Sequence, residues 1–100
     1  MEMKIINLDT WEKDMIDYIA SFDADASGEN GEDYLIDKNY KSNTEYWIDK
    51  VKNSNITFKS KVECVMDQLI ETYYAYRYKE YGVISIDEKT LAVAFSCEYK

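Results

Sequence analysis

The longest uninterrupted helical pattern in the chain covers residues 60–81 and reads SKVECVMDQLIETYYAYRYKEY. Ser60 and Glu63 have the spacing of a capping box at its start. Gly82 follows directly and suits a left-handed C-cap. The apolar residues of this stretch recur at helical spacing and form one stripe: Val62, Met66, Leu69, Ile70 and Tyr73. The pattern predicts a long amphipathic helix on which the shorter elements must pack.

Two shorter helices are predicted before this one. The first covers about residues 10–22, where Asp9 and Glu12 have the spacing of a capping signal and apolar residues recur on one side. The second covers about residues 43–53, with Ser42 as its N-cap residue. Both are amphipathic, so each can place one face on a shared core.

The C-terminal region has the strongest strand pattern in the chain. Residues 91–97 alternate large apolar residues with small ones, which is typical of a strand with one buried face. Residues 83–86 form a second predicted strand, and a turn joins the two into a β-hairpin. Residues 3–8 are a candidate third strand of the same sheet. Together these elements predict an α+β fold in which three helices pack with a small sheet, within a single compact domain over residues 1–100.

Negative charge is concentrated in the first half of the chain. The net charge is −8, and residues 1–50 carry 13 acidic and 5 basic residues, whereas residues 51–100 carry 7 of each. Ten of the acids and only one base lie between Asp9 and Asp37. Such a field disfavours direct binding to DNA or RNA phosphates and favours a basic partner protein.

Signals for catalysis are absent from the sequence. The chain has no histidine, which is the commonest general base, and it has no C-x-x-C motif and no glycine-rich phosphate loop. We therefore expect a protein that is not an enzyme and that needs no cofactor. No apolar run is long enough to span a bilayer and the N-terminus lacks a signal peptide, so we expect a cytoplasmic protein without membrane contact.

The acidic segment over residues 23–33 resembles part of a calcium-binding loop. Asp23, Asp25 and Ser27 alternate and are followed by glycine, as in the first half of an EF-hand loop. The resemblance ends there, because the twelfth position, which should hold a bidentate glutamate, is Tyr34. A weak calcium site on these three residues is one interpretation, and an acidic loop without a metal is the other.

Tyrosine is unusually frequent, with ten residues in the chain and five of them within residues 73–81. On the predicted helix, Tyr74 and Tyr78 project to the same side as Tyr81. These tyrosines lie near the side occupied by Asp67 and Glu71. Tyrosine offers a large contact area and a polar tip, so the row is a candidate binding edge. The alternative is that these rings cover the rim of a small core.

These features favour an inhibitor that occludes the nucleic-acid groove of a basic protein by mimicking a nucleic acid. In size, acidity and lack of catalytic groups the chain is similar to phage-encoded anti-CRISPR and anti-restriction proteins, although no motif matches one family. Carboxylates would replace phosphate oxygens against arginine and lysine, and association would be steered by charge. The expected contact residues are Asp14, Asp17, Asp23, Asp25, Glu29, Glu32 and Asp33, with Tyr74 and Tyr78 as anchors.

Other functions fit the same sequence. An immunity protein for a basic nuclease toxin would need the same charges, so the sequence does not separate it from an inhibitor. A weak calcium-binding module and an accessory structural subunit are further alternatives. A solubilising acidic face with no partner would also produce this composition. The sequence names neither the partner nor the oligomeric state.

Overall fold

The computed structural model describes residues 3–21, 35–72 and 76–99, with the side chains of these residues other than 72, 76–79 and 97–99. Three helices and three strands form an α+β fold, as the sequence predicted. In chain order they are β1 (Lys4–Asn7), α1 (Trp11–Ala20), α2 (Asn43–Val51), α3 (Phe58–Thr72), β2 (Tyr76–Asp87) and β3 (Thr90–Tyr99).

The three strands form one antiparallel sheet in the order β1-β3-β2, so β3 is the central strand. The candidate strand near the N-terminus joins this sheet, with Ile6 opposite Leu91. The hairpin partner β2 runs along the whole of β3, with Val83 opposite Val93. Because β1 is short, it covers only the first part of β3, whereas β2 is an edge strand over its full length.

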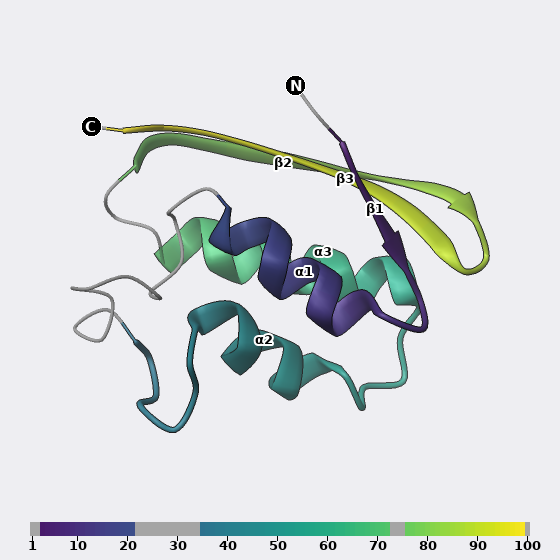
Figure 1. Cartoon of the computed structure of the whole chain (residues 1–100), viewed down its shortest axis with the longest axis horizontal. Coiled ribbons are helices and arrows are strands. Elements are labelled where there is room, and N and C mark those ends of the chain that lie inside the picture. Colours follow the sequence, from purple (N-terminus) through teal and green to yellow (C-terminus); the bar gives the residue numbers. More distant parts are fainter. Residues whose placement is uncertain (1–2, 22–34, 73–75, 100) are drawn as a thin grey trace.

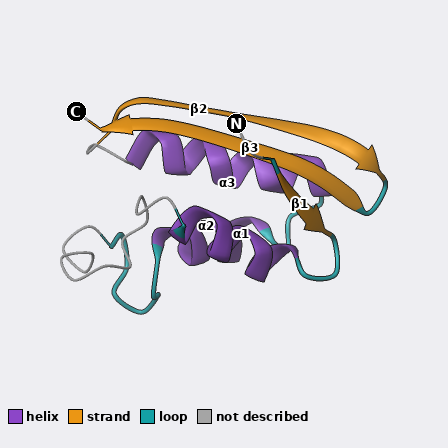
Figure 2. Ribbon diagram, turned by 45° about the horizontal axis from the view of Figure 1, so that its top comes forward, coloured by secondary structure: helices purple, strands orange, loops and turns teal. Residues whose placement is uncertain are grey.

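The helices all lie on one side of the sheet (Figures 1 and 2). α3 packs against β2 and α1 packs against β1, while α2 contacts α1 and α3. The sheet therefore has one face buried by helices, and α2 forms the layer furthest from it. α3 and β2 run along each other in opposite directions (Figure 1).

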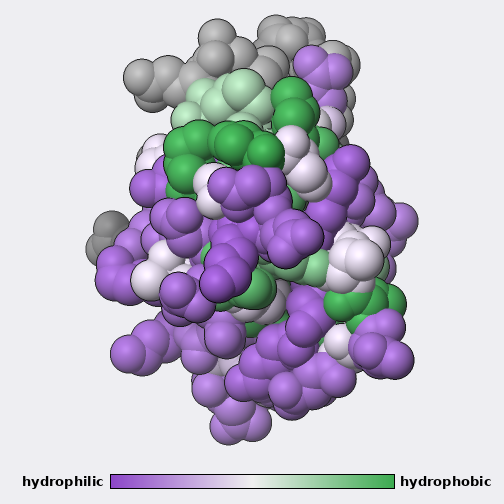
Figure 3. All heavy atoms as spheres, turned by 90° about the vertical axis from the view of Figure 1, so that its right-hand side faces the viewer, coloured by the Kyte–Doolittle hydropathy of each residue, from purple (hydrophilic) through white to green (hydrophobic). Residues whose placement is uncertain are grey.

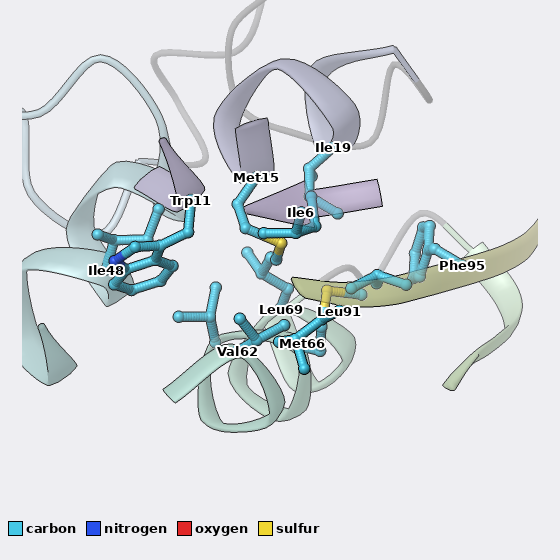
Figure 4. Close-up of a cluster of buried hydrophobic side chains, with 12 residues drawn as sticks. Ile6, Trp11, Met15, Ile19, Ile48, Val62, Met66, Leu69, Leu91 and Phe95 are labelled. Atoms are coloured by element: carbon cyan, nitrogen blue, oxygen red, sulfur yellow. The ribbon is translucent and has the colours of Figure 1, made fainter. Parts of the chain in front are cut away.

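The core lies between the sheet and the two helices beneath it (Figure 4). Leu91, Val93 and Phe95 on β3 are at most 2% exposed, and they point toward the helices because alternate residues of a strand share a face. The helical side chains that meet them are also buried, and they come from one stripe on each helix: Trp11, Met15 and Ile19 on α1, Ile48 on α2, and Val62, Val65, Met66 and Leu69 on α3.

The two shorter helices lie where the sequence placed them, with somewhat tighter ends. In α2, the Ser42 side chain accepts a hydrogen bond from the backbone N–H of Glu45 (3.2 Å), which confirms the predicted cap. The prediction of an N-cap at Asp9 is wrong, because Thr10 is the N-cap residue of α1 and its side chain forms no capping hydrogen bond.

The predicted helix over residues 60–81 is wrong at its C-terminal end. α3 ends at Thr72, and residues 76–81 belong to β2. A helix through this region would leave the second half of β3 without a paired strand, and tyrosine packs well on a sheet. Gly82 is correspondingly no helix cap, because it lies inside β2 and pairs with Ala94.

The start of α3 also differs from the sequence prediction. The backbone N–H of Ser60 donates to Thr57 Oγ1 (3.1 Å), and the N–H of Lys61 donates to the Thr57 carbonyl (3.0 Å). Thr57 is thus the N-cap residue, and Ser60 lies within the first turn. Both residues have the right chemistry for a cap, so the spacing of polar residues alone did not separate them.

We expect Thr57→Ala to lower the free energy of unfolding by about 1 kcal/mol, because it removes the side-chain acceptor at the start of α3. Ser60→Ala is the matched control and should cost clearly less, since Ser60 is not the cap. Chemical denaturation of both variants measures the difference. A larger loss in Ser60→Ala than in Thr57→Ala would contradict the cap assignment.

Candidate functional site

Asp14, one of the predicted contact residues, supports the turn between β1 and α1. Its Oδ2 accepts hydrogen bonds from the Thr10 hydroxyl (2.7 Å) and from the backbone N–H of Asn7 (3.4 Å). The carboxylate thus satisfies groups of the chain entering α1, which lacks a side-chain cap. Asp14 is therefore engaged within the fold.

Asp17, the second predicted contact on α1, lies one turn further along the helix. Its Oδ2 is 2.6 Å from Lys13 Nζ, and the two side chains are 57% and 79% exposed. This hydrogen bond and the negative charge of Asp17 raise the pKa of Lys13. Exposed pairs of this kind contribute little to stability. The pairing does reduce the negative field of α1, because one cation offsets one acid.

The remaining predicted contacts lie mainly outside the described residues. These are Asp23, Asp25, Glu29, Glu32, Asp33 and Tyr74, and the same holds for Ser27 in the calcium interpretation. Tyr78 lies in β2, where its backbone pairs with that of Glu98, and its side chain is not described.

A row of carboxylates that the sequence prediction did not assign to the site runs along α3. Glu63, Asp67 and Glu71 are spaced four residues apart, so they follow one another along one flank of the helix. We call them the α3 acidic ridge. Among the residues that the structure describes, none of the three forms an ion pair. The described cations therefore leave the three carboxylates of the ridge unpaired.

Tyr81 joins the α3 acidic ridge to β2. Its hydroxyl donates to Asp67 Oδ1 (2.5 Å) and lies 3.4 Å from the Glu63 carbonyl oxygen. Partial burial, together with the hydrogen bond to Asp67 and the nearby negative charge, raises the pKa of Tyr81 above its usual range. The sequence placed Tyr81 near the side occupied by Asp67, but along one helix. The contact is instead made from a strand to a helix.

A cluster of aromatic side chains surrounds the start of α2. The rings of Tyr40 and Trp47 both meet the Tyr46 ring edge to face, at centroid distances of 5.4 and 4.9 Å. The Tyr40 hydroxyl donates to Asp49, and this bond raises the pKa of Tyr40 to about 12 and lowers the pKa of Asp49. These contacts fasten the segment before α2 to the helix, so we assign them a structural role.

The solvent side of the sheet carries exposed apolar residues. Ile5, Ile84 and Ile86 are each about half exposed, and Ile5 and Ile84 both lie opposite Ala92, so they share a face. Figure 3, which views the hairpin end of the molecule, shows hydrophobic side chains gathered near the sheet between polar ones. This face is thus apolar near the hairpin and not covered by any described helix.

The described residues do not assemble a metal site or a membrane span. Within residues 3–21, 35–72 and 76–99, no three potential metal ligands come together. The described helices are also too short or too polar to cross a bilayer. Comparison of the chain with protein-family models, with curated proteins and with solved structures found no match.

We expect Tyr81→Phe to lower the free energy of unfolding by about 0.5–1.5 kcal/mol near neutral pH, because the hydrogen bond to Asp67 is lost. The pKa of Tyr81 is raised in the folded protein, so the unfolded chain releases this proton first as the pH rises past about 10. The advantage of the native protein over the variant should therefore be complete below about pH 10 and decline above it.

Denaturation at several pH values checks this expectation, with Tyr46→Phe as the control. No hydrogen bond of the Tyr46 hydroxyl is found in the described part of the chain, so Tyr46→Phe should lower the free energy of unfolding near neutral pH by less than Tyr81→Phe does. A difference between native and Tyr81→Phe proteins that stays constant up to high pH would contradict the assignment.

Proposed function

We propose that this protein is a non-enzymatic binding protein that occludes the nucleic-acid-binding surface of a basic partner, in the manner of phage anti-CRISPR or anti-restriction inhibitors. The observation that supports this proposal is the concentration of ten acids and one base between Asp9 and Asp37. Like charges packed this densely repel one another, and a partner of opposite sign relieves that repulsion.

Carboxylates suit this role because they present paired oxygens to arginine and lysine, as phosphates do. A row of them on a small domain also accelerates association with a basic surface, since the field orients the partner before contact. The partner would be a nuclease or another nucleic-acid-binding protein, met in the cytoplasm of a bacterium or of an infected cell. Direct binding to nucleic acid is disfavoured by the same charge.

The contacts of Asp14 and Asp17 refine which residues carry the proposal. Asp14 stabilises the turn before α1 and Asp17 is paired with Lys13, so both are weaker candidates than the acids that follow α1. The principal contacts are therefore proposed to be the five acids of the segment over residues 23–33, with Tyr74 and Tyr78 as secondary anchors.

The test is a variant that carries Asp23→Asn, Asp25→Asn, Glu29→Gln and Glu32→Gln. The immobilised protein should retain basic nucleic-acid-binding proteins from a bacterial lysate, and added duplex DNA should displace them. The variant should bind the identified partner at least about fourfold more weakly, because it removes four exposed charges and each exposed ion pair contributes about 0.2–1 kcal/mol. Its thermal unfolding should match that of the native protein.

A matched control removes four charges outside residues 9–37, by Glu45→Gln, Glu80→Gln, Glu88→Gln and Glu98→Gln. This variant should keep most of its affinity for the partner. Equal affinity of the native protein and the first variant, or partners that duplex DNA does not displace, would count against the proposal.

A further inference from the structure

Within the described part of the chain, no strand pairs with the edge of β2 that faces away from β3. Among the described residues, β2 pairs with β3 alone, and the pairing is regular from Tyr78 to Ser85 with register shifts only near its ends. A β-carbon added at Gly82 would meet no atom within 4 Å, so the face of the sheet that carries Ile84 is open at this residue. An edge of this kind presents unpaired backbone donors and acceptors to any further strand.

The backbone groups that point outward can be assigned from a contact of β3. The N–H of Phe95 donates to the Tyr18 hydroxyl of α1 (3.0 Å), so it points away from β2. Phe95 lies opposite Tyr81. In an antiparallel pair that exchanges no hydrogen bonds, the backbone N–H and C=O groups of both residues point away from the partner strand. The outward groups of β2 therefore belong to Tyr81 and, by alternation, to Lys79, Val83 and Ser85.

The usual protection of an edge strand is missing from the C-terminal half of β2. Natural edges are blunted by proline, by central bulges or by charged residues. The chain contains no proline, and the stretch from Gly82 to Ile86 carries no charge. By contrast, the free edge of β3 beyond β1 is partly satisfied by Tyr18. The open edge of β2 thus stands out from the rest of the sheet.

The α3 acidic ridge lies beside this open edge. α3 packs on the helix side of the sheet against β2 (Figure 2). The Tyr81 hydroxyl reaches from the strand to Asp67 on the flank of the helix. Successive ridge residues are about 6 Å apart along the helix axis. Alternate residues of an extended strand are about 6.8 Å apart. A strand added to β2 would therefore place its helix-side residues in near register with these carboxylates.

We infer that β2 binds an extended, basic segment of a partner protein as a fourth, antiparallel strand. Lysine or arginine at alternate positions would face the α3 acidic ridge. The intervening positions would be apolar and lie next to Ile84, which is 57% exposed on the other face of the sheet. Backbone hydrogen bonds would supply affinity, and the charges would select the sequence. This surface lies in the C-terminal half, and the inference does not rest on the proposed function.

A second copy of the chain fits the same edge poorly. Two β2 strands related by a twofold axis would bring two acidic ridges together, and like charges in close contact are unfavourable. At the alternate positions from Lys79 to Ser85 the second copy would supply one basic residue, Lys79, whereas Tyr81, Val83 and Ser85 carry no positive charge. The occupant that the edge favours is therefore a basic segment from another protein.

The probe is an eight-residue peptide in which lysine and valine alternate, added to the isotopically labelled protein and followed by NMR. The backbone amide signals of Lys79, Tyr81, Val83 and Ser85 should shift most. A peptide in which glutamate replaces lysine should not bind. Sedimentation of the protein alone should show a monomer, and a dimer whose contacts lie on β2 would overturn the proposal.

Two N-methylated peptides test the geometry without altering the protein. The peptide residues opposite Tyr81 and Val83 have their side chains on the helix side of the sheet, so these residues should be the lysines. Because the backbone groups of Tyr81 and Val83 point toward the added strand, the N–H groups of these lysines should form the hydrogen bonds to β2. Methylation of the lysine N–H groups should abolish binding, whereas methylation of the valine N–H groups should leave it nearly unchanged. Loss of binding with methylated valines, or with neither peptide, would overturn the proposal.

Two matched variants test the charges. The variant with Glu63→Gln and Glu71→Gln keeps Asp67 and its contact with Tyr81. Its affinity for the lysine–valine peptide should be about fivefold lower. Asp9→Asn with Glu12→Gln removes the same charge far along the chain and should change the affinity less than twofold. Equal weakening by both variants would show that only net charge matters and would overturn the role of the ridge.

Discussion

The fold depends on the burial of one face of β3. Leu91, Val93 and Phe95 are fully enclosed between the neighbouring strands and the helices, and the buried stripes of α1 and α3 converge on them. Each such side chain contributes about 1.5–3 kcal/mol when it leaves water. Because β3 is central, both other strands take their positions from it, and the rest of the chain only has to cover the one apolar face.

This arrangement divides the molecule into regions with different electrostatic character. On α1, Asp14 accepts a hydrogen bond from Thr10 in the preceding turn, and Asp17 pairs with Lys13. The flank of α3 carries three acids without an ion pair among the described residues, and Tyr81 ties one of them to the sheet. The carboxylates of α1 and those of α3 therefore differ: Asp14 and Asp17 have partners within the fold, whereas no described cation pairs with the three acids of α3.

Several parts of the fold followed from the sequence because the deciding interactions are local. The alternation in residues 91–97 predicted β3, and the Ser42 hydroxyl predicted the start of α2. The tyrosine-rich run after Thr72 was misassigned, because its residues fit both a helical stripe and a strand, and Gly82 imitated a helix cap. Only pairing with β3, which is distant in sequence, decides between them.

The candidate site was less predictable for the same reason. Glu63 and Asp67 are visible in the sequence, but their closeness to a strand edge depends on residues 14 to 18 positions away. The open edge of β2 is a property of strand order, which local patterns do not determine. The acids of residues 23–33 were recognisable from composition alone, because their signal is the lack of bases rather than any contact.

Hydrogen exchange of the backbone amides in β2 tests the central claim most directly, which is that β2 pairs with β3 on one side and is open on the other. In the protein alone, the amides of Glu80, Gly82 and Ile84 should exchange slowly, because they bond to β3, and those of Tyr81, Val83 and Ser85 should exchange fast. Slow exchange at both sets would mean that the edge is already covered. Fast exchange at both would mean that β2 is not paired with β3.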